Sequence, residues 1–225
     1  MIVVPGNVIG KIGQKAEGSY YIYENYIISN TVALKETKKD KIKITPLSGI
    51  YIPKKGDLVI GKVIEVYPNG WLIDINSPYT GFLLIKDGVN EFIDITKIDL
   101  NDYYTYGDFI VAKVLNVMRN KIINLTTKEK GLGKLKEGLV ISINPKKVPR
   151  VIGKNASMLQ TIKQITNVDI IVGQNGRIWI SGENKQKELI VAKAIYMIEK
   201  MSHTKGLTDK IKKFLEEEIK KLSNG

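Results

Sequence analysis

Apolar residues in the first part of the chain come in short runs that are separated by turn-forming and charged residues. Runs of this length and β-type composition predict strands. The strands are expected to form two hairpins, 19–23 with 26–29 and 31–34 with 41–44, the second across a charged turn at 35–40. Residues 1–52 therefore predict a small all-β domain, which would be only marginally stable by itself.

The first of these hairpins is rich in tyrosine. Its aromatic side chains could stack on bases, but packing within a sheet or contact with another protein is the more common role for such residues. We therefore favour a packing or protein-contact role for Tyr20, Tyr21, Tyr23 and Tyr26.

The middle of the chain contains five longer β-type runs. They are 58–66, 71–75, 81–85, 109–117 and 122–126. Five strands with a longer connection after the third are typical of an OB barrel. By alternation, Trp71 and Ile73 share one face of their strand, while Leu72 and Asp74 share the other. Residues 53–129 therefore predict a five-stranded barrel.

The last part of the chain mixes strands and helices after a stretch at 128–138 that we interpret as a linker. The expected order is a strand at 139–143, a helix from Ser157 to about Thr166, a hairpin across the Asn-Gly turn at 174–176 and a helix at 186–201. The expected inward residues are Leu159, Ile162 and Ile165 on the first helix, and Leu189, Ala192, Ile195 or Tyr196, and Met201 on the second. A final amphipathic helix, with Thr208 as its N-cap, presents Leu207, Ile211, Phe214, Leu215, Ile219 and Leu222. Residues 130–225 therefore predict an α+β domain.

A short loop between two helical segments is the most informative motif in this α+β domain. Its sequence is Val-Ile-Gly-Lys-Asn-Ala-Ser at 151–157. Gly153 and the small Ala156 leave little side-chain bulk, so a nucleic-acid backbone can approach closely. The amide groups that open the following helix can hold phosphate oxygens. The loop therefore indicates a phosphate-binding bend.

Composition excludes several kinds of chemistry. The 225 residues include no cysteine, which excludes disulfides, thiol catalysis and cysteine-ligated zinc. A single histidine makes a histidine metal site or a Ser/His triad improbable, and we expect no metal and no cofactor. No run approaches the length of a membrane span, and the first residues are not typical of a secretory signal. We therefore expect a soluble cytoplasmic protein.

Charge is distributed unevenly along the chain. Residues 130–225 hold 19 basic and 9 acidic side chains, so they carry +10 of the total net charge of +12. Residues 53–129 hold 9 basic and 10 acidic side chains. A general lysine bias would have made the middle third basic as well, so the asymmetry favours a polyanion-binding surface near the glycine loop.

The barrel sequence resembles the S1-type OB fold, which binds single-stranded RNA. The resemblance is carried by Gly-Asp-Leu-Val-Ile-Gly-Lys-Val at 56–63, Gly70 and Asp74-Ile75. The resemblance implies RNA contacts by Lys62, Arg119 and Lys121. The family's stacking positions fall on Asn69, Leu72 and Leu84, whereas the aromatic residues Trp71 and Phe82 are displaced and are expected to face the core or a neighbouring domain.

The α+β domain resembles a KH domain in its type I arrangement, an RNA-binding module that clamps about four nucleotides. The Val-Ile-Gly-Lys phrase, the Asn-Gly hairpin and Trp179 carry this resemblance, and Ala156 stands where the family has the second glycine of its GXXG loop. The resemblance implies a groove floored by Ile152, Leu159, Ile162 and Ile170, with phosphates attracted by Lys146, Lys147, Arg150 and Lys154. The resemblance also implies that Gly153, Lys154, Asn155 and Ala156 form the clamp itself. Burial in the core is the favoured role for Leu159 and Ile162 individually.

Taken together, the chain resembles the S1/KH-type RNA-binding cap subunits of the archaeal exosome. Phrases outside the two modules agree, namely Val-Val-Pro-Gly at 3–6, Gly-Ile-Tyr-Ile-Pro at 49–53, Gly-Leu-Gly-Lys-Leu at 131–135 and His-Thr-Lys-Gly-Leu-Thr-Asp at 203–209. The resemblance implies three copies on a hexameric ring of RNase PH-like subunits, docked through the N-terminal domain. It also implies that this chain captures single-stranded RNA and that its partners cleave it.

Two other functions stay open on the sequence. An S1 module followed by KH also resembles part of the bacterial elongation factor NusA, which suggests a free RNA-binding regulator of transcription or translation. That factor carries a second KH domain, which is missing here. A nuclease would need carboxylates that converge on Mg²⁺, and the dense set is Glu91, Asp94, Asp99, Asp102 and Asp108. A solvated loop beside a barrel strand is the more common explanation for such spacing.

Overall fold

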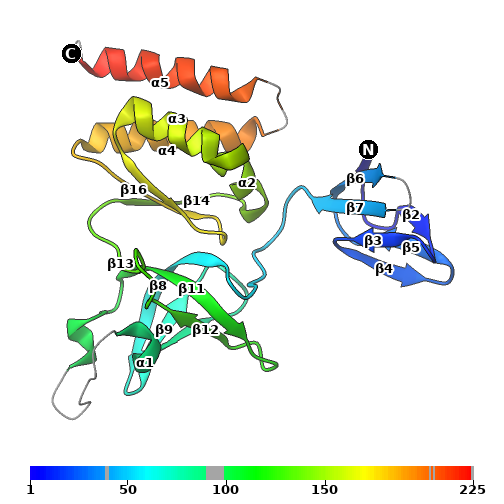
Figure 1. Cartoon of the computed structure of the whole chain (residues 1–225), viewed down its shortest axis with the longest axis horizontal. Helices are drawn as coiled ribbons and strands as arrows, with labels where there is room; N and C mark the ends of the chain where they lie inside the picture. Colours follow the sequence, from blue (N-terminus) through cyan, green and yellow to red (C-terminus); the bar gives the residue numbers. More distant parts are fainter. Residues whose placement is uncertain (39–40, 90–98, 203, 205, 224–225) are drawn as a thin grey trace. The chain divides into compact units, whose positions relative to one another are not determined.

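The computed structural model describes residues 1–38, 41–89, 99–202, 204 and 206–223. The chain forms two compact units, Met1–Gly49 and Ile50–Gly225 (Figure 1). The first unit has one hydrophobic core and the second has two. The predicted domain limits of 1–52, 53–129 and 130–225 stay predictions. Within the described residues, no helix combines the length and the apolar character needed to span a membrane.

The first unit consists of two small sheets around a core of aliphatic side chains. One sheet has the order β1 (Ile2–Val3), β6 (Ala33–Lys38), β7 (Lys41–Pro46) and β3 (Lys15–Glu17), and the other has the order β2 (Val8–Lys11), β5 (Tyr26–Ser29) and β4 (Tyr20–Tyr23). The core residues are Val3, Ile9, Ile27, Ala33, Ile42 and Ile44. Both predicted hairpins are confirmed.

The charged turn in this unit is shorter than predicted. Residues 35–38 belong to β6, where Lys35 and Thr37 pair with Ile44 and Ile42 of β7. An antiparallel pair of strands can carry polar and charged side chains on its solvent-facing side. The charged residues at 35–38 were therefore compatible with a strand and did not require a turn. Residues 39–40 lie outside the described part of the chain.

The second unit begins with a closed five-stranded barrel. Its strands are β8 (Leu58–Tyr67), β9 (Gly70–Asp74), β10 (Gly81–Leu84), β11 (Phe109–Val117) and β12 (Ile123–Thr126). Antiparallel pairs join β10 to β9, β9 to β8, β8 to β11 and β11 to β12, and a parallel pair of β10 with β12 closes the ring. Trp71, Ile73 and Leu83 are fully buried inside it. The five predicted barrel strands are therefore confirmed.

Two short helical segments and one extra strand are attached to the barrel. The helical segments are α1 (Ile85–Gly88) and a 3₁₀ turn at Leu100–Asp102. The extra strand, β13 (Gly133–Lys134), pairs with β11 at Ile110 and Val111. The prediction that 128–138 is only a linker was therefore wrong for these two residues, because the open edge of β11 provides backbone partners.

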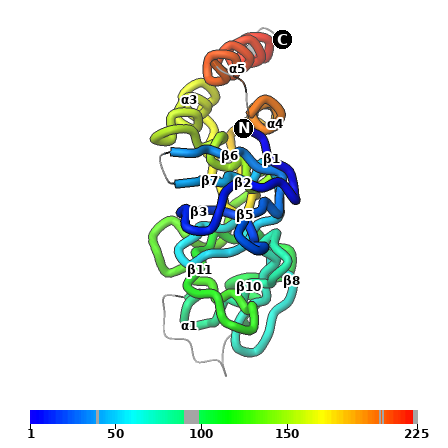
Figure 2. Tube along the Cα trace, turned by 90° about the vertical axis from the view of Figure 1, so that its right-hand side faces the viewer, coloured from blue at the N-terminus to red at the C-terminus, as the bar shows by residue number. Residues whose placement is uncertain are grey.

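The rest of the second unit has the order β-α-α-β-β-α followed by one more helix. The elements are β14 (Leu139–Ser142), a 3₁₀ turn (Pro145–Lys147), α2 (Val148–Ile152), a second 3₁₀ turn (Lys154–Ala156), α3 (Ser157–Thr166), β15 (Asp169–Val172), β16 (Arg177–Ser181), α4 (Lys185–Lys200) and α5 (Leu207–Ser223). The sheet order is β14, β16, β15, and α3 and α4 lie on one face of it (Figure 1). Helix α5 packs on α3 and α4, and the tube view in Figure 2 shows the three helices at one end of this unit.

The inward faces of the first two long helices differ from the predicted ones. Helix α3 buries Met158, Ile162 and Thr166, whereas Leu159 and Ile165 are only partly buried. On α4, Leu189 is 54% exposed and Tyr196 is 40% exposed, and the buried residues are Ile190, Val191, Ala192, Ala194, Ile195 and Ile198. Each helix contacts both a sheet and another helix, so its buried stripe is wider than a single row of side chains.

Helix α5 covers the domain with the residues predicted for it. Leu207, Ile211 and Leu215 are buried, and Phe214, Ile219 and Leu222 are partly buried. The helix begins at Leu207, so Thr208 lies within its first turn and the prediction of Thr208 as N-cap was wrong. His203 lies outside the described residues.

Candidate nucleic-acid interface

The bend between α2 and α3 depends on a glycine. Gly153 has φ +76°, a region that side chains with a Cβ rarely adopt, and its amide donates to the carbonyl of Pro149 at 3.0 Å. A Cβ on Gly153 would lie 2.8 Å from the backbone nitrogen of Met158. No other residue fits this position without displacing the start of α3.

The two residues that follow Lys154 continue the bend in the left-handed region. Asn155 has φ +53° and Ala156 has φ +60°. Asparagine tolerates this conformation, but in alanine it costs about 1–2 kcal/mol. Lys154 and Asn155 are exposed, and Ser157 immediately opens the ten-residue helix α3. The loop therefore presents a lysine and an amide side chain, while the amides of Ala156 and Ser157 donate to the carbonyls of Gly153 and Lys154.

The other predicted cations near the loop differ in their surroundings. The Nε of Arg150 donates to the carbonyl of Ser202 at 2.6 Å, just beyond the end of α4. Lys147 is half-buried, while Lys146 is exposed. A hollow beside the loop is lined by Arg150 and Lys154, and also by Asp209 from α5. Because that carboxylate repels phosphate, the exposed outer side of the loop is the better surface for a nucleic-acid backbone.

Only part of the predicted groove floor is accessible. Ile162 and Ile170 are buried in the hydrophobic core, whereas Ile152 and Leu159 are half-buried. Core burial is therefore confirmed for Ile162 but only in part for Leu159, and the place of Ile170 in a groove stays a prediction. The accessible apolar surface beside the loop reduces to Ile152 and Leu159.

The barrel presents an aromatic pair on its outer face. Phe82 of β10 lies opposite Leu72 of β9, and its ring centroid is 6.1 Å from that of Tyr67 with the rings tilted by 52°. The neighbours of Phe82 on β10, Gly81 and Leu83, take the buried positions. Phe82 therefore does not face the barrel core, and the alternative that it faces a neighbouring domain stays a prediction.

Trp71, by contrast, is fully buried as predicted. Its indole nitrogen donates to the carbonyl of Tyr104 at 2.8 Å, and the two rings meet edge to face at 5.0 Å. Its apolar surface supports the barrel core, so Trp71 has no surface left for a base.

Tyr67 remains a neutral aromatic surface. Its hydroxyl donates to a carboxylate oxygen of Glu65 at 2.8 Å, and this hydrogen bond raises the pKa of the Tyr67 phenol above its ordinary value. Tyr67 is 38% exposed as a residue. Tyr67 was not predicted as a site residue, because it is the last residue of β8 and its approach to Phe82 depends on how β8, β9 and β10 pair.

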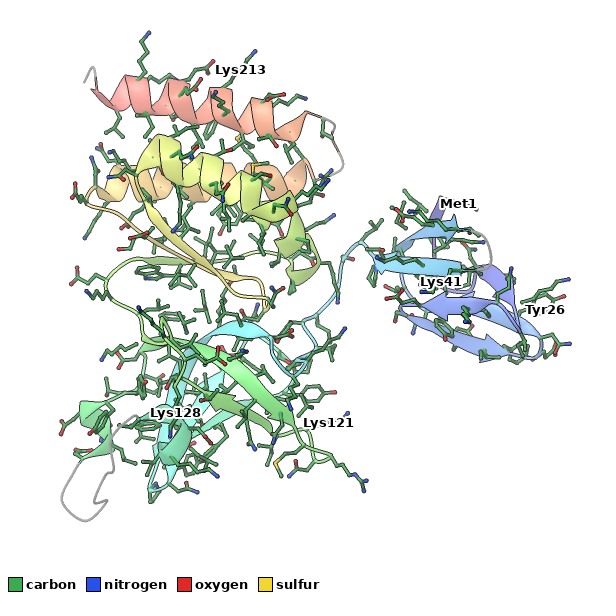
Figure 3. The ribbon with its side chains drawn as sticks, viewed as in Figure 1. Met1, Tyr26, Lys41, Lys121, Lys128 and Lys213 are labelled. Atoms are coloured by element: carbon green, nitrogen blue, oxygen red, sulfur yellow. The ribbon has the colours of Figure 1, made fainter. Side chains whose placement is uncertain are left out.

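The basic residues predicted on the barrel lie in two places. Arg119 and Lys121 belong to the turn between β11 and β12, where Figure 3 labels Lys121. The Nζ of Lys121 is 5.7 Å from the centre of the Tyr79 ring. Lys62 is half-buried on β8, with its Nζ 5.9 Å from the centre of the Phe109 ring. Arg119 and Lys121 are therefore the exposed cations of the barrel hairpin, while Lys62 lies apart from them.

Two family models match this chain. Residues 50–116 match the S1 domain of RRP4, and residues 138–186 match the KH domain. The exosome complex component Rrp4 of Thermococcus kodakarensis is 41% identical over 98% of this chain and 87% of its own length. That of Thermoplasma acidophilum is 42% identical over 96% of this chain and 90% of its own length. The chain belongs to the Rrp4 family.

A solved structure agrees with this assignment. It is a crystal structure described as that of an exosome complex RNA-binding protein, and it superposes on the chain with a TM-score of 0.72 at 39% identity. The superposition covers 76% of this chain and 98% of that one. The S1 barrel and KH fold described above are therefore those of an Rrp4-family protein.

Two of the carboxylates considered for a nuclease, Asp99 and Asp108, make structural contacts. Asp99 accepts from the amide of Asn101, which holds the pKa of Asp99 below its ordinary value. Asp108 accepts from the amide of Thr105 at 2.9 Å and pairs with Lys134 at 2.5 Å. Glu91 and Asp94 lie outside the described residues. Among the residues that are described, no three His, Cys, Asp or Glu side chains come together as metal ligands.

Proposed function

We propose that this Rrp4-family chain is a non-catalytic subunit that captures single-stranded RNA and guides its 3′ end into a phosphorolytic ring of RNase PH-like subunits. The bend at residues 153–156 is the observation that carries the proposal. It exposes Lys154 and Asn155 on a backbone that Gly153 alone permits. Phosphates bind such a bend through charge and main-chain amides, with little dependence on base identity.

The barrel face supplies a second contact in this proposal. The rings of Tyr67 and Phe82 offer stacking surface, and base stacking on an aromatic side chain contributes about 1–3 kcal/mol. Arg119 and Lys121 add charge at the neighbouring hairpin. The KH loop then holds the RNA backbone while the barrel holds bases.

Docking to the ring is proposed for the first unit. Its β4–β5 hairpin exposes Tyr21 (47%), Ile22 (58%), Tyr23 (61%) and Tyr26 (40%). Aromatic and aliphatic side chains that cluster on one exposed hairpin are typical of a protein-contact surface. Figure 3 labels Tyr26 on this hairpin. We propose that three copies of the chain dock through this surface on one hexameric ring.

Two experiments test the proposal. The full chain is expected to co-purify with RNase PH-like ring subunits, and Tyr23→Asp is expected to abolish this, whereas Lys15→Asp in the same unit has no effect. Purified alone, the chain is expected to bind single-stranded RNA without degrading it in Mg²⁺ and phosphate. Failure to bind the ring would favour a free RNA-binding regulator, and phosphate- or Mg²⁺-dependent decay would favour an enzyme.

A further inference from the structure

The turn between β15 and β16 is bonded to the S1 barrel. Asn175 is a polar residue with no exposed surface. Its side-chain nitrogen donates to the carbonyls of Ile60 at 2.7 Å and Ile75 at 2.9 Å, and its side-chain oxygen accepts from the amide of Ile60 at 3.2 Å. Asn76 donates to the main-chain carbonyl of Asn175 at 2.8 Å. The side chain of Asn175 therefore pairs with barrel backbone as another peptide group would.

Further contacts extend the junction along β8. The amide of Gln174 donates to the carbonyl of Leu58 at 2.7 Å. A Cβ on Gly173 would lie 2.9 Å from the nitrogen of Ile60, so the close approach requires glycine. The pairing of β8 with β9 begins only at Lys62. The KH turn thus bonds the part of the β8 edge that β9 leaves open.

Arg177 closes the other side of the junction. Its guanidinium donates to the carbonyl of Asp74 at 2.6 Å and pairs with the Asp74 carboxylate. The same guanidinium lies 6.0 Å from the centre of the Phe109 ring, and its side chain is only 12% exposed. Because an Asn-Gly turn by itself needs no burial and no partners, these contacts serve the junction rather than the hairpin.

We infer that Asn175 and Arg177 are positioning residues that fix the KH loop relative to the barrel face, so that two weak RNA sites act as one. The inference rests on the proposed function. Two modules joined only by a flexible segment must lose orientational freedom when one RNA strand engages both. A rigid junction removes that loss before binding, and a strand held at one site then meets the other at high effective concentration.

The inference is tested with Asn175→Ala in the full chain, with Asn101→Ala on an exposed turn as the matched control. The chain has no cysteine, so spin labels can be attached to cysteines introduced at Tyr106 on the barrel and Lys185 on α4. We expect a narrow distance distribution in the parent and in Asn101→Ala, and a broad one in Asn175→Ala. A narrow distribution in Asn175→Ala overturns the inference.

RNA length separates positioning from simple loss of the KH fold. RNA of about four nucleotides fills the KH clamp alone, whereas a longer strand reaches both sites. Asn175→Ala is expected to lower the affinity for the longer RNA about tenfold or more. Its affinity for the short RNA is expected to stay within about twofold of the parent's. Equal loss for both lengths, or no loss for either, overturns the positioning role.

A conservative variant keeps the inference testable if Asn175→Ala does not fold. Arg177→Lys preserves the charge but removes the fork that reaches both the Asp74 carbonyl and its carboxylate. Arg177→Lys is expected to lower the affinity for the longer RNA alone, and by less than Asn175→Ala does. An unchanged affinity for the longer RNA counts against the inference. A parent chain that binds neither RNA overturns the proposed function instead. The spin-label distances still measure the rigidity of the junction in that case, because they need no RNA.

Discussion

The two regions proposed to bind RNA are built in opposite ways. The KH loop uses main-chain geometry, with bends of positive φ at Gly153, Asn155 and Ala156 around one exposed lysine. The barrel face uses side chains, namely the rings of Tyr67 and Phe82 on a regular sheet. A site built from main-chain geometry tolerates few substitutions and has little base preference. A site built from aromatic side chains keeps its fold when one ring is removed but loses the affinity that stacking on that ring contributes.

The comparison is sharpened most by removing the glycine of the loop. In Gly153→Ala, the new Cβ adds a close contact to the conformational strain at φ +76°, so we expect about 3 kcal/mol of lost stability. Gly131→Ala is the matched control, because Gly131 has φ +88° but a Cβ added there would have no neighbouring atom within 4 Å. It is expected to lose about 1 kcal/mol. Urea unfolding measures both, and equal losses would show that the close approach at Gly153 is unimportant.

The barrel side of the comparison is tested by Phe82→Ala. Loss of one stacked base is expected to weaken binding of single-stranded RNA by about 1–3 kcal/mol, or roughly 5- to 150-fold in affinity. The stability of the protein should change little, because Phe82 lies on the outer face of the barrel. Tyr106→Ala removes another exposed ring, on the turn before β11, and is expected to leave affinity unchanged. Equal effects of the two variants in a binding titration would contradict a stacking site at Phe82.

Charge at the barrel hairpin is expected to show in the salt dependence. Replacing both Arg119 and Lys121 by glutamine removes two phosphate contacts, so the slope of log affinity against log salt should fall by about 1.4 for a single strand. The short RNA that occupies only the KH clamp should keep its slope. Titrations at several salt concentrations measure this, and an unchanged slope for the longer RNA would remove these residues from the interface.

The smallest expected effect is a gain in folding stability. Ala156→Gly relieves the strain of a left-handed alanine, about 1–2 kcal/mol, but frees the unfolded chain by about 0.4–1 kcal/mol. We expect a net stabilisation of about 0.5 kcal/mol and unchanged or tighter RNA binding. A loss of stability on thermal unfolding would mean that the side chain of Ala156 makes a contact that offsets its strain.

What could be predicted from sequence follows the same division. The KH loop was predictable because a local requirement, a residue without a Cβ at Gly153, is written directly in the sequence. The barrel strands were predictable because alternation marks their buried faces, as Trp71 and Ile73 show. The outward direction of Phe82 was missed because a family position was compared residue by residue, while the face of a strand repeats every second residue.

Contacts between distant segments were beyond the sequence. Asn175 appeared only as part of a tight turn, yet its partners Ile60 and Ile75 lie 115 and 100 positions away. Arg150 looked like a free cation until the structure placed it on the carbonyl of Ser202. The buried side of α4 shifted from Leu189 to Ile190 because α5 and the sheet together decide which residues are covered.

The central claim is tested most directly by placing carboxylates in the KH loop of the assembled complex. Lys154→Asp with Asn155→Asp changes the loop charge by −3 without touching Gly153. Lys213→Asp with Lys212→Asn makes the same change on the exposed side of α5 (Figure 3). With the ring present, the loop variant is expected to lose RNA affinity at least about tenfold and to slow RNA decay, while the α5 variant matches the parent. RNA affinity of the loop variant equal to that of the parent would contradict the account.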